Sequence, residues 1–102
     1  MNRLKGTLVV MFHSNWCPYC RSFAPIFIEY ARKSDFEYGQ ISLDNDDDPL
    51  WDKFHIEAVP TVIVFKEGMR IARRDSTLGG GLNRDDMESL IREVVTKVNV
   101  KP

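Results

Sequence analysis

The chain has 102 residues, of which 43% are hydrophobic and 28% are charged, a composition typical of a water-soluble globular protein. We therefore expect one domain over residues 1–102. With a net charge of -1, the chain lacks the excess of basic residues that binds nucleic acids and anionic membranes, so neither is an expected partner. The longest apolar runs, residues 8–12 and 62–65, are too short to span a bilayer, and we expect no cleavable signal before them. These features predict a cytoplasmic monomer.

The first half of the chain predicts a strand, a helix and a second strand. Residues 7–12 form a short, nearly continuous apolar run, which is typical of a strand buried on both faces. Residues 18–33 carry apolar side chains at helical spacing. Pro18 suits the first turn of that helix, and Pro25 is expected to kink its middle. Residues 36–43 predict the second strand.

The second half predicts a short helix, a hairpin and a long helix. Asp48 as N-cap and Pro49 in the first turn open the short helix. Residues 61–65 and 70–74 predict the two antiparallel strands of the hairpin, and Asn83 is expected to cap the last helix. The order strand, helix, strand, helix, hairpin, helix predicts an α/β fold with its first two strands parallel.

Cys17 and Cys20 are the only cysteines, and they lie between the first predicted strand and its helix. A disulfide between them closes too short a loop to stabilise the fold, which indicates a redox or metal-binding role. The carboxyl end of a strand is also where open α/β sheets place their sites. Backbone N–H groups and the helix dipole at a helix N-terminus favour a thiolate, so Cys17 is the expected nucleophile. Cys20, one turn further along, is the expected resolving thiol.

A pair of cysteines at this spacing is also half of a tetrahedral zinc site. The sequence offers no second Cys/His pair to complete such a site, because His13 and His55 stand apart. We therefore predict no metal ligands. The acidic residues 44 and 46–48 are interpreted as a solvated loop and a helix cap, since Pro49 and His55 stand where a calcium loop needs Gly and Glu.

Several motifs together resemble the thioredoxin superfamily over residues 7–97. They are the apolar first strand, Trp16-Cys17-Pro18-Tyr19-Cys20, Pro25 within the helix, and Val59-Pro60-Thr61 leading into the strand and turn of residues 62–68. The resemblance implies a thioredoxin-like fold, with a central four-stranded mixed sheet flanked by helices. It also implies that the family's usual extra N-terminal strand and helix are missing. Gly80 or a neighbour is similar to the family's glycine at the active-site rim.

The resemblance also implies which residues face a substrate. The peptide bond before Pro60 is expected to be cis and to face the cysteines, and Val59 is expected to offer backbone groups to an extended substrate. Trp16 is expected to shield one side of the pair while leaving an apolar surface for a substrate. Pro18 and Tyr19 complete the predicted substrate-contacting set.

The sequence departs from the thioredoxin pattern at two charged positions. Thioredoxins typically carry a buried Asp and an accompanying Lys, where this chain has Met11 and Gln40. Cys20 then needs another route for its proton. His13 is a candidate base, because it lies on the same strand face as Met11, and Asp44 ends the adjacent strand where it can orient the imidazole. We predict a His13–Asp44 contact, with simple space filling by His13 as the alternative.

Three functions agree with this sequence. The leading one is a protein disulfide reductase with no bound cofactor, which acts on disulfide-containing proteins and receives electrons from a thioredoxin-reductase-like flavoenzyme. The second is a glutathione-dependent glutaredoxin activity, because Pro18-Tyr19 resembles the glutaredoxin motif and residues 79–81 with Asp85 and Asp86 weakly resemble its glutathione-binding segment. The third is a non-catalytic module in which two chains share a metal ion or an iron-sulfur cluster.

Overall fold

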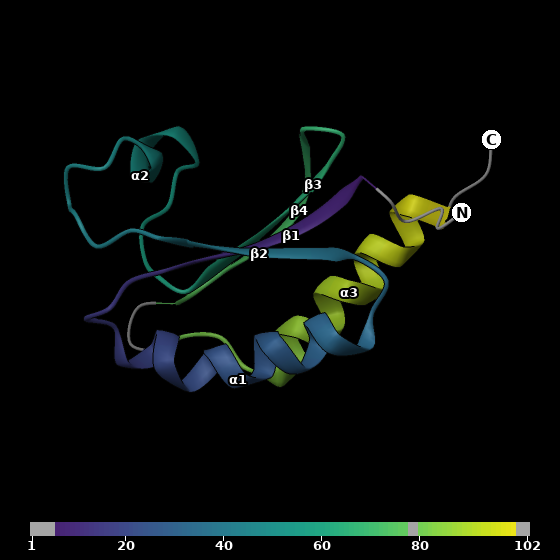
Figure 1. Ribbon diagram of the computed structural model, residues 1–102, viewed down its shortest axis with the longest axis horizontal. Helices are drawn as coiled ribbons and strands as arrows, with labels where there is room; N and C mark the ends of the chain where they lie inside the picture. Colours follow the sequence, from purple (N-terminus) through teal and green to yellow (C-terminus); the bar gives the residue numbers. More distant parts are fainter. Residues whose placement is uncertain (1–5, 78–79, 100–102) are drawn as a thin grey trace.

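A computed structural model describes residues 6–77 and 80–99, which form an α/β fold around one four-stranded sheet (Figure 1). The order of strands across the sheet is β2-β1-β3-β4. The elements in chain order are β1 (Thr7–His13), α1 (Pro18–Lys33), β2 (Glu37–Ser42), α2 (Leu50–Lys53), β3 (Thr61–Lys66), β4 (Met69–Asp75) and α3 (Arg84–Asn99). The predicted order of elements and the four-stranded mixed sheet are therefore confirmed.

β1 and β3 are the two central strands of the sheet and its most apolar ones. β1 runs parallel to β2, with Met11 opposite Gln40, and antiparallel to β3, with Phe12 opposite Thr61. β3 in turn pairs antiparallel with β4 through the predicted hairpin. Consequently, the carboxyl end of β1 lies beside the start of β3, at one end of these two central strands.

The short helix α2 begins later than predicted. Its first helical residue is Leu50, and Pro49 stands in the capping position without a side-chain hydrogen bond. Asp48 still serves the helix start, because its carboxylate accepts a hydrogen bond of 2.9 Å from the Leu50 backbone N–H. Pro49 already has helical backbone angles (φ -63°, ψ -15°), so the difference is one residue at the helix boundary.

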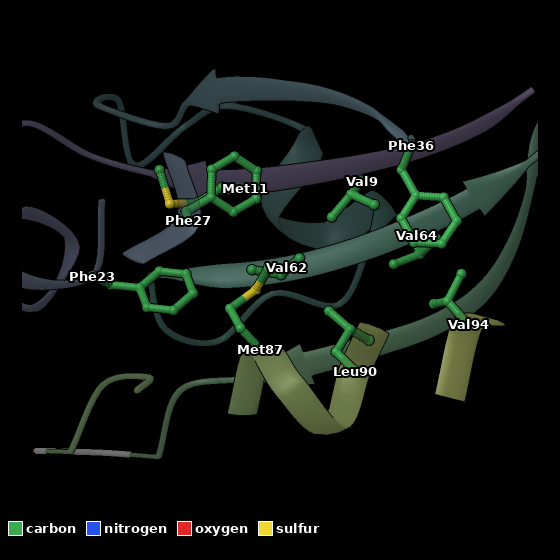
Figure 2. Close-up of a cluster of buried hydrophobic side chains, with 10 residues drawn as sticks. All are labelled: Val9, Met11, Phe23, Phe27, Phe36, Val62, Val64, Met87, Leu90 and Val94. Carbon is green, nitrogen blue, oxygen red and sulfur yellow. The ribbon is translucent and has the colours of Figure 1, made fainter. Parts of the chain in front are cut away.

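The larger core fills the space between one face of the sheet and the two long helices (Figures 1 and 2). Side chains alternate between the faces of a strand, so every second residue of β1 and β3 points into this core. Helices α1 and α3 contribute the apolar stripes that the sequence predicts. Its buried members are Val9, Met11, Phe23, Phe27, Phe36, Val62, Val64, Met87, Leu90 and Val94.

A smaller core lies on the opposite face of the sheet, which α2 covers (Figure 1). Its buried members are Val10, Phe12, Cys17, Cys20, Leu43, Ile56, Val59 and Ile63. The two cysteines therefore belong to a packed apolar environment rather than to an exposed loop. Within the described residues, no helix combines the length and the apolar character needed to cross a membrane.

Candidate active site

Cys17 is the N-cap of α1, as the sequence predicts. Its backbone is extended (φ -99°, ψ 111°), and Pro18 follows in the first turn. The Cys17 Sγ atom accepts a hydrogen bond of 3.1 Å from the Cys20 backbone N–H, one of the N–H groups that a helix start leaves without an intrahelical partner. Both this N–H group and the N-terminal end of the helix are therefore directed at the Cys17 sulfur.

Cys20 lies one helical turn further on, in surroundings that disfavour a charged sulfur. Burial raises the pKa of the Cys20 thiol to about 12, and the hydrogen bond with Cys17 and the charge of Cys17 act in the same direction. A backbone hydrogen bond from Ser14 opposes this rise. Cys20 is therefore a protonated thiol at neutral pH. The geometry thus separates the two sulfurs into a nucleophile and a proton-bearing partner.

The Val59–Pro60 peptide bond is cis, as the resemblance implies. It stands against the first cysteine, because the Cys17 thiol donates a hydrogen bond of 3.3 Å to the Val59 carbonyl oxygen. Pro60 itself is buried. The two segments meet because β1 and β3 are antiparallel neighbours, which brings residue 59 to the end of β1.

A groove of about 300 Å³ opens beside Cys17. The predicted contact residues Trp16, Pro18, Tyr19 and Val59 line it. The Trp16 side chain is 56% exposed and that of Tyr19 is 42% exposed, so both present apolar surface to a partner. The groove also includes residues that sequence reasoning missed, which are Trp51, Glu57, Ala58 and Thr77.

Within the described part of the chain, no direct hydrogen bond or ion pair joins His13 to Asp44, although the charge of His13 acts on the Asp44 carboxylate. Among the described residues, the Asp44 carboxylate is bound by the backbone N–H of Asn15 at 2.7 Å, the Asn15 side-chain amide at 2.8 Å and the Ser42 hydroxyl at 2.7 Å. These hydrogen bonds, led by that of Ser42, lower the pKa of Asp44, and the charge of His13 makes the smallest contribution. Asp44 therefore connects the loop before Cys17 to the end of β2 through its hydrogen bonds with Asn15 and Ser42. No local sequence motif predicts this role of Asn15.

Met11 and Gln40, which stand where thioredoxins typically have charges, are opposite each other in the sheet register. Met11 is 1% exposed and belongs to the larger core, whereas Gln40 is exposed. The two positions at which the family's usual charges are absent are therefore neighbours on paired strands.

The glycine at the active-site rim is Gly81, a neighbour of the predicted Gly80. Gly81 has φ +65°, and a Cβ atom added there would lie 2.9 Å from the Tyr19 Cβ atom. Only a residue without a side chain allows the chain to pass this close to Tyr19 with that backbone. Gly79, part of the segment that weakly resembles a glutathione site, lies outside the described residues.

One acidic residue of that segment, Asp86, has a structural role at the start of α3. The Asn83 side chain accepts a hydrogen bond of 3.0 Å from the Asp86 backbone N–H, and the Asp86 carboxylate accepts one of 2.9 Å from the Asn83 backbone N–H. This reciprocal capping confirms Asn83 as the predicted cap of α3. Residues 6–77 and 80–99 contain no group of three or more His, Cys, Asp or Glu side chains arranged to hold a metal ion.

Replacing Gly81 with alanine is expected to destabilise the protein by about 1–3 kcal/mol, because the new methyl group meets Tyr19 in a left-handed backbone. Urea unfolding followed by circular dichroism measures this change. Gly68→Ala is the matched control, since Gly68 also has a positive φ of +85° but nothing lies within 4 Å of the added Cβ. Equal losses in the two variants would show that contact with Tyr19 contributes nothing.

Comparisons with known proteins agree with this geometry. The model of the thioredoxin family matches residues 1–93. Thioredoxin H-type of Oryza sativa subsp. indica is 34% identical over 87 residues, which are 82% of this chain and 65% of that protein. Thioredoxin H5 of Arabidopsis thaliana is 37% identical over 73 residues, 71% of this chain and 61% of that protein. The chain thus matches less than two thirds of the length of these two relatives.

Solved structures share the same architecture. The crystal structure of reduced Schistosoma mansoni thioredoxin pre-protein is 27% identical, with a TM-score of 0.72 over 88% of this chain and 80% of that one. The X-ray structure of Fasciola hepatica thioredoxin is 25% identical, with a TM-score of 0.72 over 89% of this chain and 84% of that one. The fold, the Cys17–Cys20 pair at a helix start and the family match converge, and the chain belongs to the thioredoxin family.

Proposed function

We propose that this protein is a thiol-disulfide oxidoreductase that reduces disulfide bonds in other proteins. The observation that carries the proposal is the position of Cys17 Sγ. It accepts a hydrogen bond from the Cys20 backbone at 3.1 Å, contacts the Val59 carbonyl oxygen at 3.3 Å and lines an open groove. Although only 3% of Cys17 is exposed, its sulfur borders the groove from which a substrate disulfide would approach.

The reaction follows from the different states of the two sulfurs. The Cys17 thiolate attacks one sulfur of the substrate disulfide, a mixed disulfide forms, and the other substrate sulfur leaves with the electron pair. Cys20 then loses its proton and attacks Cys17 Sγ. This second attack forms the Cys17–Cys20 disulfide and releases the second substrate thiol, so the substrate gains two electrons and the protein loses two.

The groove suits an extended substrate segment. The Val59 backbone offers hydrogen-bonding groups next to Cys17, and Trp16, Pro18 and Tyr19 supply the apolar surface around it. No bound cofactor is needed, since the cysteine pair carries the electrons itself. We propose a thioredoxin-reductase-like flavoenzyme as the electron donor and a monomer in a reducing compartment such as the cytoplasm, where a lone pair of closely spaced cysteines serves redox chemistry.

Two measurements test the proposal. The first follows reduction of a protein disulfide with either NADPH and a thioredoxin reductase, or glutathione and glutathione reductase, as the source of electrons. We expect turnover with the first donor, and turnover only with glutathione would favour the glutaredoxin alternative. The second titrates the Cys17–Cys20 pair in graded thiol-disulfide buffers, with Cys17→Ser as control. A two-electron potential near the roughly -270 mV of thioredoxin is expected, and failure to titrate would contradict the proposed function.

A further inference from the structure

The groove beside Cys17 contains a carboxylate that the reaction does not use. Glu57 is exposed and lines this groove, whose other side chains, apart from the cysteine, are aromatic, aliphatic or uncharged. Within residues 6–77 and 80–99, no hydrogen bond or ion pair engages the Glu57 carboxylate. Its charge is therefore available to a segment that occupies the groove.

The cation nearest to Glu57 in the arrangement of hollows is already neutralised by another residue. Glu57 also borders a second hollow, which Arg73 and Asp75 line. The Arg73 guanidinium donates two hydrogen bonds to the Asp75 carboxylate, at 2.6 and 2.9 Å, and a third to the Phe54 carbonyl oxygen at 2.8 Å. This two-point contact with Asp75 satisfies the charge of Arg73, so the charge of Glu57 is left uncompensated.

The opposite side of the groove adds charge of the same sign. There Trp16 borders a further hollow that is also lined by Asp46 and Asp47, both exposed. No basic residue lines that hollow within the described part of the chain. A cation that enters the groove is therefore attracted from both sides, and an anion is repelled.

The backbone on both sides of Glu57 is fixed by hydrogen bonds from the sheet. Before Glu57, Arg73 of β4 donates to the Phe54 carbonyl oxygen, and after it, the Thr61 hydroxyl of β3 donates to the Ala58 carbonyl oxygen at 2.7 Å. The carboxylate is thus held at one place in the groove by rigid elements, which a residue that discriminates between substrates requires.

Glu57 lies at a defined separation from the reacting sulfur. It stands two residues before Val59, whose carbonyl oxygen is 3.3 Å from Cys17 Sγ. Two residues of chain span at most about 7 Å, both in this protein and in a substrate. A substrate whose cysteine meets Cys17 consequently places the side chain two positions from that cysteine within reach of Glu57.

We propose that Glu57 is a specificity-determining residue, which favours substrate segments with a lysine or arginine two positions from the reacting cysteine and disfavours acidic segments. The inference rests on the proposed function, because it names the class of disulfide on which that activity acts. The discrimination has an attractive and a repulsive part: the carboxylate pairs with a basic side chain and opposes an acidic one.

The probes are disulfide-linked dimers of one short peptide that contains a single cysteine. Three versions carry lysine, glutamine or glutamate two positions to either side of the cysteine, so that either orientation in the groove presents the same charge to Glu57. Reduced protein is mixed with an excess of each dimer, the reaction is stopped with acid, and chromatography measures the released peptide thiol. Each rate constant is divided by that of dithiothreitol with the same dimer, which removes differences in intrinsic reactivity.

For the wild-type protein we expect the lysine dimer to react roughly tenfold faster than the glutamate dimer, with the glutamine dimer between them. An exposed charge pair contributes roughly threefold, once as attraction and once as repulsion. Glu57→Gln should lower the lysine-to-glutamate ratio to less than roughly threefold, and Glu57→Lys should invert the preference. High salt should reduce the wild-type ratio.

Two variants with the same change of charge are the controls. Glu37→Gln lies at the start of β2, opposite Leu8 and at the far end of the sheet from Cys17, and should keep the wild-type ratio. Asp47→Asn alters the neighbouring hollow and should lower the ratio by less than roughly twofold.

A wild-type ratio near one overturns the proposal, as does a wild-type ratio that persists in Glu57→Gln. Equal losses in Glu57→Gln and Asp47→Asn also overturn it, because they show that the general field of the acidic residues, and not Glu57, sets the preference. Failure of the wild-type protein to reduce any of the three dimers would instead count against the proposed function itself.

Discussion

Cys20→Ser is expected to convert the protein into a trap that stays covalently attached to its substrate. Cys17 keeps its hydrogen bond from the residue 20 backbone and still attacks a disulfide, but no thiol remains to resolve the mixed disulfide. Turnover should fall by roughly a hundredfold or more, while close to one equivalent of substrate becomes bound through Cys17. Non-reducing electrophoresis and intact-mass measurement of the complex, before and after addition of dithiothreitol, check this outcome.

Cys17→Ser is the matched control for the trap. Both cysteines are buried, at 3% and 4% exposure, and serine is close in size to cysteine, so the two variants place similar demands on the fold. We expect no covalent complex with Cys17→Ser, because the protonated Cys20 thiol is a poor nucleophile. A complex that forms with Cys17→Ser and not with Cys20→Ser would reverse the assigned roles.

Phe27→Ala is expected to cause the largest loss of stability. Phe27 lies in the larger core at 1% exposure, with its ring 5.3 Å from that of Tyr38 in an edge-on contact and 6.3 Å from that of Phe23 (Figure 2). Removing a buried phenyl ring costs about 3–5 kcal/mol, a large part of the roughly 5–15 kcal/mol that stabilises a domain. Urea unfolding should show a lower midpoint with an unchanged slope.

Ile28→Ala provides the comparison on the same helix. Ile28 is the next residue of α1 but is 38% exposed, so its truncation removes much less buried surface. We expect it to cost less than about 1 kcal/mol. Similar losses from the two variants would contradict the prediction that burial of the Phe27 ring sets the cost, because alanine has the higher helix propensity and a propensity effect would favour both variants.

The sequence predicts the fold well because its strongest patterns coincide with its most buried elements. β1 and β3 are nearly continuous apolar runs, and they form the two central strands of the sheet. The edge strand β2 is less well predicted, since Phe36 and Leu43 are buried but flank the strand Glu37–Ser42. Hydrophobicity alone does not distinguish a buried residue in the ladder from one just beyond it.

For the candidate site, too, local sequence features predict some residues, whereas the roles of others depend on contacts between distant parts of the chain. Cys17 and Cys20 are recognisable because their spacing and their place before a helix are local features. Asn15 acquires its role from a contact that the chain makes only after folding, with Asp44. The predicted pairing of His13 with Asp44 did not anticipate Asn15, whose backbone and side chain both donate hydrogen bonds to that carboxylate.

The hydrogen bond from the Cys20 backbone to Cys17 Sγ makes the first turn of α1 sensitive to oxidation. When the sulfur enters a disulfide, the acceptor that caps the helix changes from a cysteine sulfur to a disulfide sulfur, whose capping strength differs. By thermodynamic linkage, the stability of this turn also affects the reduction potential of the cysteine pair. Any change that stabilises the turn in the dithiol form more than in the disulfide form makes the pair more oxidising. About 1.4 kcal/mol of such preference corresponds to about 30 mV, so helix capping here is also a means of setting the direction of electron flow.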